Sequence, residues 1–121
     1  MEGYKSPSLG NEISCVMHGI SEEILNNNSE LENNLIDALK QDGFNILEKA
    51  SHHYEPRGFT LVVLLAESHA SIHTYPEHNS LFFYLYSCRG KGDGRETFEI
   101  FKEKIKPTSV DFSQRTIVVK R

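Results

Sequence analysis

Apolar side chains recur along the chain with two different periods, and these periods predict strands and helices. Alternate positions are apolar in residues 11–17, so that Ile13, Cys15 and Met17 share one face of a predicted strand. In residues 30–42 the apolar positions are instead three or four apart, which predicts an amphipathic helix. Its apolar face consists of Leu31, Leu35, Ala38 and Leu39.

Polar residues and a glycine indicate where the first helical segments begin and end. Ser21 can cap a short helical turn, and Ser29 with Glu32 has the spacing of a capping box for the long helix. Gly43 stands where a glycine commonly ends a helix. We therefore expect a short turn followed by a helix that lies between Ser29 and Gly43.

A second long helix is predicted near the C-terminus. Asp93 can act as its N-cap with Glu96 three residues later, and Pro107 marks its end. The stretch Gly90–Gly94 lacks the GxxxxGK[ST] spacing of a phosphate-binding loop, so we interpret it as a turn from strand to helix. The apolar face of the helix carries Phe98, Phe101 and Ile105.

The remaining apolar runs predict strands. Strands over residues 44–53 and 59–66 flank a turn, and another pair of strands flanks residues 76–79. Residues 59–66 are apolar at nearly every position, so we expect this strand to be buried on both faces. A last strand with weaker alternation is predicted over residues 110–119.

The order of these elements predicts the fold class. It is β-α-β-β-β-β-α-β, with hairpins in the middle, and each long helix follows a strand. We therefore expect an α+β fold, a two-layer sandwich of an antiparallel β-sheet with two α-helices packed on one face. A length of 121 residues predicts a single domain over residues 1–121.

Composition excludes several classes of function. A net charge of −4 argues against nucleic-acid binding, which requires a basic surface. There is no apolar run of the length that a membrane helix needs and no secretion signal, so a cytoplasmic location is expected. Cys15 and Cys88 are too few and too far apart for a disulfide framework, and both are predicted to be free thiols, Cys15 within the core.

A dense polar cluster over residues 66–77 lies between two apolar strands and holds the candidate chemistry. It contains two serines, two histidines and two carboxylates, which no folding requirement explains. His69 and His73 are four residues apart, and in a strand this separation is about 13 Å, too far for both to bind one Zn²⁺. We therefore predict no metal site.

The cluster resembles a known family of self-processing enzymes. Glu67-Ser68-His69, the run Ile72 to Glu77 and the later Cys88 resemble the small prokaryotic-type S-adenosylmethionine decarboxylases, from about Ser8 to the end of the chain. The resemblance implies self-cleavage between Glu67 and Ser68. Ser68 Oγ attacks the Glu67 carbonyl to form an ester, and elimination followed by hydrolysis leaves a pyruvoyl cofactor derived from Ser68.

The resemblance also implies the roles of other residues. His73 corresponds to the base that removes the Ser68 α-proton, and Cys88 to the group that returns a proton to the substrate carbon after decarboxylation. Thr60 stands where a serine usually assists cleavage and keeps the hydroxyl. Glu77 is expected to hold the ribose hydroxyls of S-adenosylmethionine.

Two aromatic positions complete this set. Tyr54 corresponds to the ring that stacks on adenine, and Tyr75 stands where many members have tryptophan, which bears on substrate preference. The resemblance implies an enzyme of spermidine biosynthesis and a homodimer with both active sites near its interface. Two alternatives stay open: a pyruvoyl-dependent decarboxylase of arginine or ornithine, and a catalytically silent paralogue that activates a partner enzyme.

Overall fold

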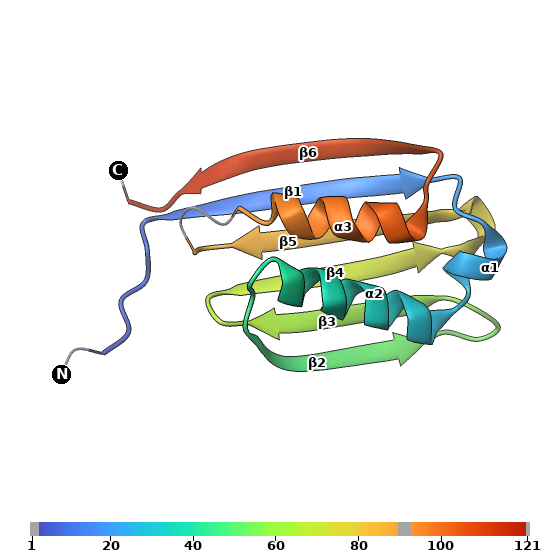
Figure 1. Cartoon of the computed structure of the whole chain (residues 1–121), viewed down its shortest axis with the longest axis horizontal. Helices are drawn as coiled ribbons and strands as arrows, with labels where there is room; N and C mark the ends of the chain where they lie inside the picture. The colour runs from blue at the N-terminus through green and yellow to red at the C-terminus, as the bar shows by residue number, and fades with distance from the viewer. Residues whose placement is uncertain (1–2, 90–92, 121) are drawn as a thin grey trace.

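A six-stranded antiparallel sheet forms one layer of the molecule (Figure 1). The computed structural model describes residues 3–89 and 93–120. The strands lie side by side in the order β2-β3-β4-β5-β1-β6. Their bounds are β1 Leu9–His18, β2 Ile46–His53, β3 Phe59–Leu65, β4 Ser68–Tyr75, β5 Ser80–Ser87 and β6 Ser109–Val118.

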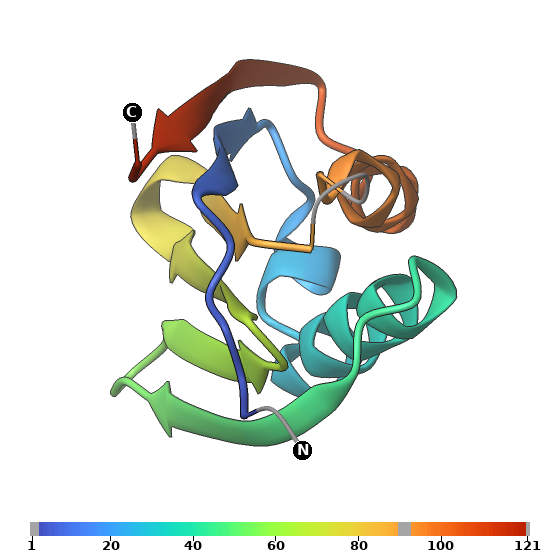
Figure 2. The same cartoon turned by 90° about the vertical axis from the view of Figure 1, so that its left-hand side faces the viewer.

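The helices form the second layer and cover one face of the sheet, as Figure 2 shows. They are α1 Glu22–Leu25, α2 Asn28–Gln41 and α3 Arg95–Ile105, and a short 3₁₀ turn η1 spans Pro76–His78. This arrangement confirms the predicted α+β sandwich. Within the described ranges, no helix is long and apolar enough to cross a membrane.

The core lies between the helices and the inward side chains of the sheet. Leu31 and Leu35 of α2 are fully buried there. The Phe83 ring of β5 packs with its centroid 5.8 Å from Phe98 and 5.7 Å from Phe101, both on α3. Burial of each such side chain contributes about 1.5–3 kcal/mol, so apolar packing holds the two layers together.

The start of α2 differs from the predicted capping box. Asn27 is the N-cap, and its side-chain oxygen accepts a hydrogen bond from the Glu30 backbone N–H at 3.2 Å. Ser29 already lies within the first turn, and Glu32 pairs with Lys49 of β2 instead of reaching back to a cap. Asparagine caps at least as well as serine, so the earlier cap prevails.

The end of α2 confirms the role predicted for Gly43. Gly43 has a φ of 87°, in the left-handed region that glycine adopts without strain. The Phe44 N–H donates to the Leu39 carbonyl and the Gly43 N–H donates to the Lys40 carbonyl, each at 3.0 Å. This bonding pattern is a Schellman motif.

The start of α3 corrects a second predicted cap. Gly94, and not Asp93, is the N-cap, with a φ of 89°. The Asp93 carboxylate accepts hydrogen bonds from the Arg95 N–H at 2.9 Å and from Gln114 at 3.0 Å. A Cβ at position 94 would lie 2.3 Å from Leu85 Cδ2, so only glycine fits there. Residues 90–92 of the predicted glycine-rich turn lie outside the described residues.

The prediction that the strand over residues 59–66 is buried on both faces was wrong. Val62 and Leu64 are 43% and 50% exposed, and buried and exposed residues alternate along β3. In the described part of the chain, all three helices lie on the other side of the sheet (Figure 2). We call this uncovered side the outer face. Its strand positions include Thr60, Val62, Leu64, His69, Ser71, His73, Phe82, Tyr84 and Tyr86.

Candidate functional site

A tight turn between β3 and β4 contains the bond predicted to be cut. Leu65 pairs with Ser68 across this turn, and Ala66 and Glu67 connect them. Glu67 has a φ of 66°, in the left-handed region that a residue with a Cβ enters at a cost of about 1–2 kcal/mol. The backbone is therefore strained at the residue that would supply the attacked carbonyl.

Ser68 and Cys88 are brought together at this end of the sheet. Ser68 opens β4 and is 6% exposed, and it pairs with Ser87 at the end of β5. The Cys88 backbone N–H donates a hydrogen bond to Ser68 Oγ at 3.3 Å. Both cysteines of the chain are free thiols, as predicted. A hydrogen bond with the Cys88 side chain, followed by desolvation, raises the pKa of Tyr86.

His73 and Thr60 form a second group. They are directly opposite each other on β4 and β3, and His73 Nδ1 lies 3.0 Å from Thr60 Oγ1. The Tyr54 hydroxyl lies 3.2 Å from the same Thr60 oxygen. An N–H on Nδ1 that donates to Thr60 leaves Nε2 with its lone pair, which is the tautomer a general base needs.

The two groups do not meet within one copy of the chain. Ser68 and His73 are five residues apart on β4, a separation of about 17 Å along a strand. Their side chains also point to opposite faces, because Ser68 is on the buried side and His73 is on the outer face. His73 therefore cannot act on Ser68 of its own chain in this arrangement.

The β2–β3 loop and η1, which hold the predicted substrate-binding residues, lie at the other end of the sheet (Figure 1). Tyr54 lines an open hollow of about 300 Å³ together with the β2–β3 loop. Glu77 lies in η1, and its Oε2 is 3.7 Å from Nη2 of Arg57, which lines the same hollow. Tyr54 and Glu77 are thus joined to one region through Arg57, and this region adjoins the Thr60 and His73 group.

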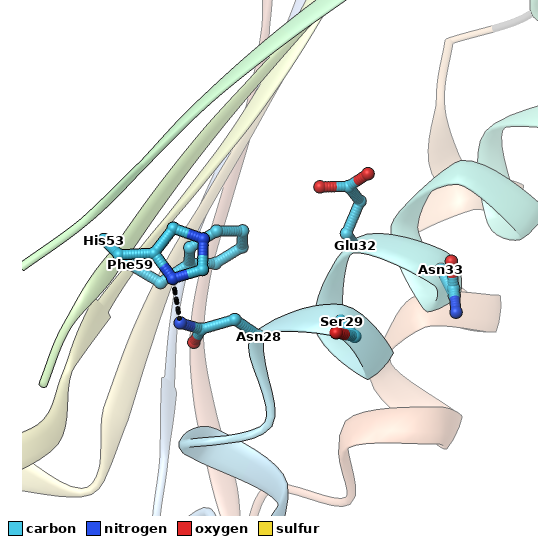
Figure 3. Close-up of a pocket in the computed structure, with 6 residues that line it drawn as sticks. All are labelled: Asn28, Ser29, Glu32, Asn33, His53 and Phe59. Carbon is cyan, nitrogen blue, oxygen red and sulfur yellow. Dashed lines mark hydrogen bonds between the residues drawn. The ribbon is translucent and has the colours of Figure 1, made fainter.

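A neighbouring cavity contains none of the predicted site residues. Figure 3 shows this space of about 270 Å³ between the start of α2 and the β2–β3 hairpin. Asn28 Nδ2 lies 3.0 Å from His53 Nδ1, and the Phe59 ring, which also lines the cavity, lies behind the His53 ring in this view. Asn28 and His53 are thus bonded to each other, whereas Glu32 pairs with Lys49 of β2. Among the described residues, no group of three or more potential ligands is arranged to hold a metal ion.

A polar network lies on the outer face, and no sequence motif indicated it. Tyr84 donates a hydrogen bond to Glu12 Oε2 at 2.7 Å, and Arg115 Nε donates to the other carboxylate oxygen at 3.0 Å. Hydrogen bonds from Tyr84 and then Arg115 lower the pKa of Glu12. Burial, followed by the bond to Glu12, raises the pKa of Tyr84 to about 12. The alternation of strand positions could have placed these residues on one face of the sheet, but no sequence motif indicates that they form a network.

Tyr4 is a further residue that no motif indicated. Desolvation, followed by the charges of Glu67 and Cys88, raises the pKa of Tyr4. The segment that precedes β1 therefore passes close to the turn that contains the predicted cleavage bond.

Comparison with known proteins establishes the family. The family model for S-adenosylmethionine decarboxylase matches residues 11–116. An S-adenosylmethionine decarboxylase proenzyme from Persephonella marina is 33% identical over 104 residues, 86% of this chain and 78% of the relative. The proenzyme from Thermosipho africanus is 32% identical over 112 residues, 93% of this chain and 82% of the relative.

A solved structure agrees with these sequence matches. The adenosylmethionine decarboxylase from Aquifex aeolicus matches with a TM-score of 0.81 at 25% identity, over 91% of each chain. The chain therefore belongs to the S-adenosylmethionine decarboxylase family, which confirms the resemblance seen in the cluster around Ser68.

Proposed function

We propose that this protein is an S-adenosylmethionine decarboxylase that is made as a proenzyme and cuts itself between Glu67 and Ser68. The observation that carries the proposal is the contact between Ser68 Oγ and the Cys88 N–H beside a strained turn, in a chain of this family. Cleavage would give fragments of 67 residues and, since 121 − 67 = 54, of 54 residues.

The strained turn favours attack by Ser68 on the preceding carbonyl. Ester formation breaks the Glu67–Ser68 amide bond, so Glu67 is released from its left-handed conformation. This release contributes about 1–2 kcal/mol towards a step that otherwise exchanges a stable amide for an ester. A base must then remove the Ser68 α-proton before the ester is eliminated, and His73 is the proposed base.

The surroundings of Ser68 suit a pyruvoyl group formed from that residue. When present, such a group supplies the electron sink that amino-acid decarboxylation requires. Cys88 adjoins Ser68 and is only partly buried, so its thiol can be reprotonated by solvent. We assign Cys88 the return of a proton to the substrate carbon, because it is the nearest thiol to the position of Ser68 Oγ and Cys15 is buried in the core.

The separation of about 17 Å between Ser68 and His73 along β4 supports a homodimer. In the proposed dimer, the outer faces of two copies pack against each other, and the two-fold axis lies between the two sheets, perpendicular to the strands. The strands of the partner subunit therefore run in the opposite direction. Such packing brings the partner subunit's His73 to the end of the sheet where Ser68 lies, which removes the separation along the strand, and it covers Val62 and Leu64, which are exposed in one copy. Sedimentation should give the mass of a dimer, and Val62→Lys should give a monomer that cleaves slowly. A wild-type monomer that cleaves at full rate would contradict this packing.

We further propose that S-adenosylmethionine is the substrate and that its product serves spermidine synthesis in the cytoplasm. Tyr54 offers an aromatic face to adenine, and Glu77 offers carboxylate oxygens to the ribose hydroxyls. The cytoplasmic location is supported by the two free thiols.

The test compares release of labelled carbon dioxide from S-adenosylmethionine, arginine and ornithine by the self-cleaved protein. We expect release from S-adenosylmethionine alone, with Glu77→Gln losing about 1.5–3 kcal/mol in kcat/KM. Glu103→Gln, an exposed change on α3, is the matched control. Preference for arginine or ornithine with Glu77→Gln indifferent would overturn the substrate assignment. Release from none of the three would favour the silent paralogue.

A further inference from the structure

The residue that follows Cys88 is bound firmly to the end of α2. Arg89 Nη1 donates a hydrogen bond to the Asp42 backbone carbonyl, and Nη2 donates to Asp42 Oδ1, each at 2.6 Å. The guanidinium carbon also lies 3.5 Å from the centroid of the Phe44 ring. Side-chain exposure is 23% for Arg89 and 8% for Asp42, so water competes little for this pair.

The same carboxylate also fixes the start of α3. Asp42 Oδ2 accepts hydrogen bonds from the Thr97 N–H at 3.0 Å and from Thr97 Oγ1 at 2.7 Å. The N-cap of α3, Gly94, has no side chain with which to satisfy these first N–H groups. Asp42 therefore joins the end of α2, the start of α3 and the exit of β5.

Cys88 lies between two anchors as a result. Its own N–H donates to Ser68 Oγ, and the next residue is held by Asp42. After cleavage at Glu67–Ser68, Asp42 would belong to the first fragment, whereas Cys88 and Arg89 would belong to the second. The ion pair would then tie the two fragments together one residue from the proposed proton donor.

We propose that the Asp42–Arg89 ion pair is a positioning device that holds the Cys88 thiol over the reacting carbon. The inference rests on the proposed function. Correct placement sends the proton from Cys88 to the substrate carbon that has lost carbon dioxide. If the thiol is misplaced, the proton goes instead to the enzyme carbon that was Ser68 Cα before cleavage. Hydrolysis then leaves the substrate nitrogen on the enzyme as an N-terminal alanine and releases an aldehyde.

The first measurement does not depend on activity. Cys88 is alkylated with iodoacetamide in the uncut Ser68→Ala chain, where the contact with Ser68 Oγ is lost and the Asp42 pair is the anchor that remains, with buried Cys15 as the internal reference. Arg89→Gln should raise the Cys88 rate about threefold or more because the segment opens more often. Arg89→Lys keeps the charge but loses the planar guanidinium that makes two hydrogen bonds. The Cys88 alkylation rate in this variant should lie between the rates with Arg89 and with Arg89→Gln. Lys49→Gln, which breaks a different ion pair to α2, should leave the rate unchanged.

The second measurement uses self-cleaved protein and mass spectrometry. It gives the number of decarboxylated product molecules formed for each second fragment whose N-terminus has been converted to alanine. Arg89→Gln should lower this count about tenfold while Lys49→Gln keeps it, a change that a general loss of stability does not produce. An unchanged alkylation rate or an unchanged count in Arg89→Gln would overturn the inference. If wild-type protein releases no carbon dioxide from S-adenosylmethionine, the proposed function fails instead, and alkylation still decides whether Arg89 holds Cys88.

Discussion

Replacement of Thr60 by valine tests whether its hydroxyl orients His73. Thr60→Val keeps the shape and the β-branching of the side chain, so strand β3 should form as before. It removes the contact of 3.0 Å between Thr60 Oγ1 and His73 Nδ1. One neutral hydrogen bond is worth about 0.5–1.5 kcal/mol, which corresponds to about a 2- to 13-fold change in a rate. We expect self-cleavage to slow by a factor in this range.

The assay follows conversion of freshly synthesised precursor into two fragments over time, and a parallel sample is treated with hydroxylamine to reveal any accumulated ester. Thr60→Ser should cleave at close to the wild-type rate because the hydroxyl is kept. Thr74→Val is the matched control, since Thr74 Oγ1 accepts from the Phe59 N–H at 2.8 Å in the same hairpin but on the opposite face. Thr60→Val cleaving as fast as wild type, or Thr74→Val being equally slow, would refute the reasoning.

Two further predictions concern Cys88 and Tyr84. Cys88→Ala should cleave to a substantial extent but decarboxylate poorly and accumulate N-terminal alanine on the second fragment; full turnover without inactivation would show that the proton has another source. The pKa of Tyr84 is raised from 10.0 to about 12, so the stabilisation it provides is complete below pH 10 and lost as pH rises to about 12. The difference in free energy of unfolding between wild type and Tyr84→Phe should shrink over that interval, and a constant difference would contradict the assignment.

The sequence predicted the elements of the fold well because periodicity is a local property. The face of α2 formed by Leu31, Leu35, Ala38 and Leu39 is buried as expected. The errors lie where a local signal had competitors: Asn27 displaced Ser29 as a cap, and apolar Val62 and Leu64 face outwards. An exposed apolar strand residue and a doubly buried one look alike in sequence, because the difference depends on what covers the sheet.

The candidate site could be predicted only as a set of residues. The resemblance selected Ser68, His73 and Cys88, but strand register decides that Ser68 meets Cys88 and that His73 meets Thr60. Asp42 and Arg89 are 47 residues apart in sequence, and no pattern links an aspartate at the end of a helix to an arginine after a strand. Contacts of this kind arise from tertiary structure and have no local signature.

Intact mass spectrometry of the purified wild-type protein tests self-cleavage between Glu67 and Ser68. We expect two fragments, residues 1–67 and residues 68–121, with a pyruvoyl group in place of Ser68 at the start of the second. Ser68→Ala, which has no hydroxyl to attack the Glu67 carbonyl, should remain a single chain of 121 residues. A wild-type chain that stays intact, or a Ser68→Ala chain that is cut at the same bond, would show that Ser68 does not cut the chain.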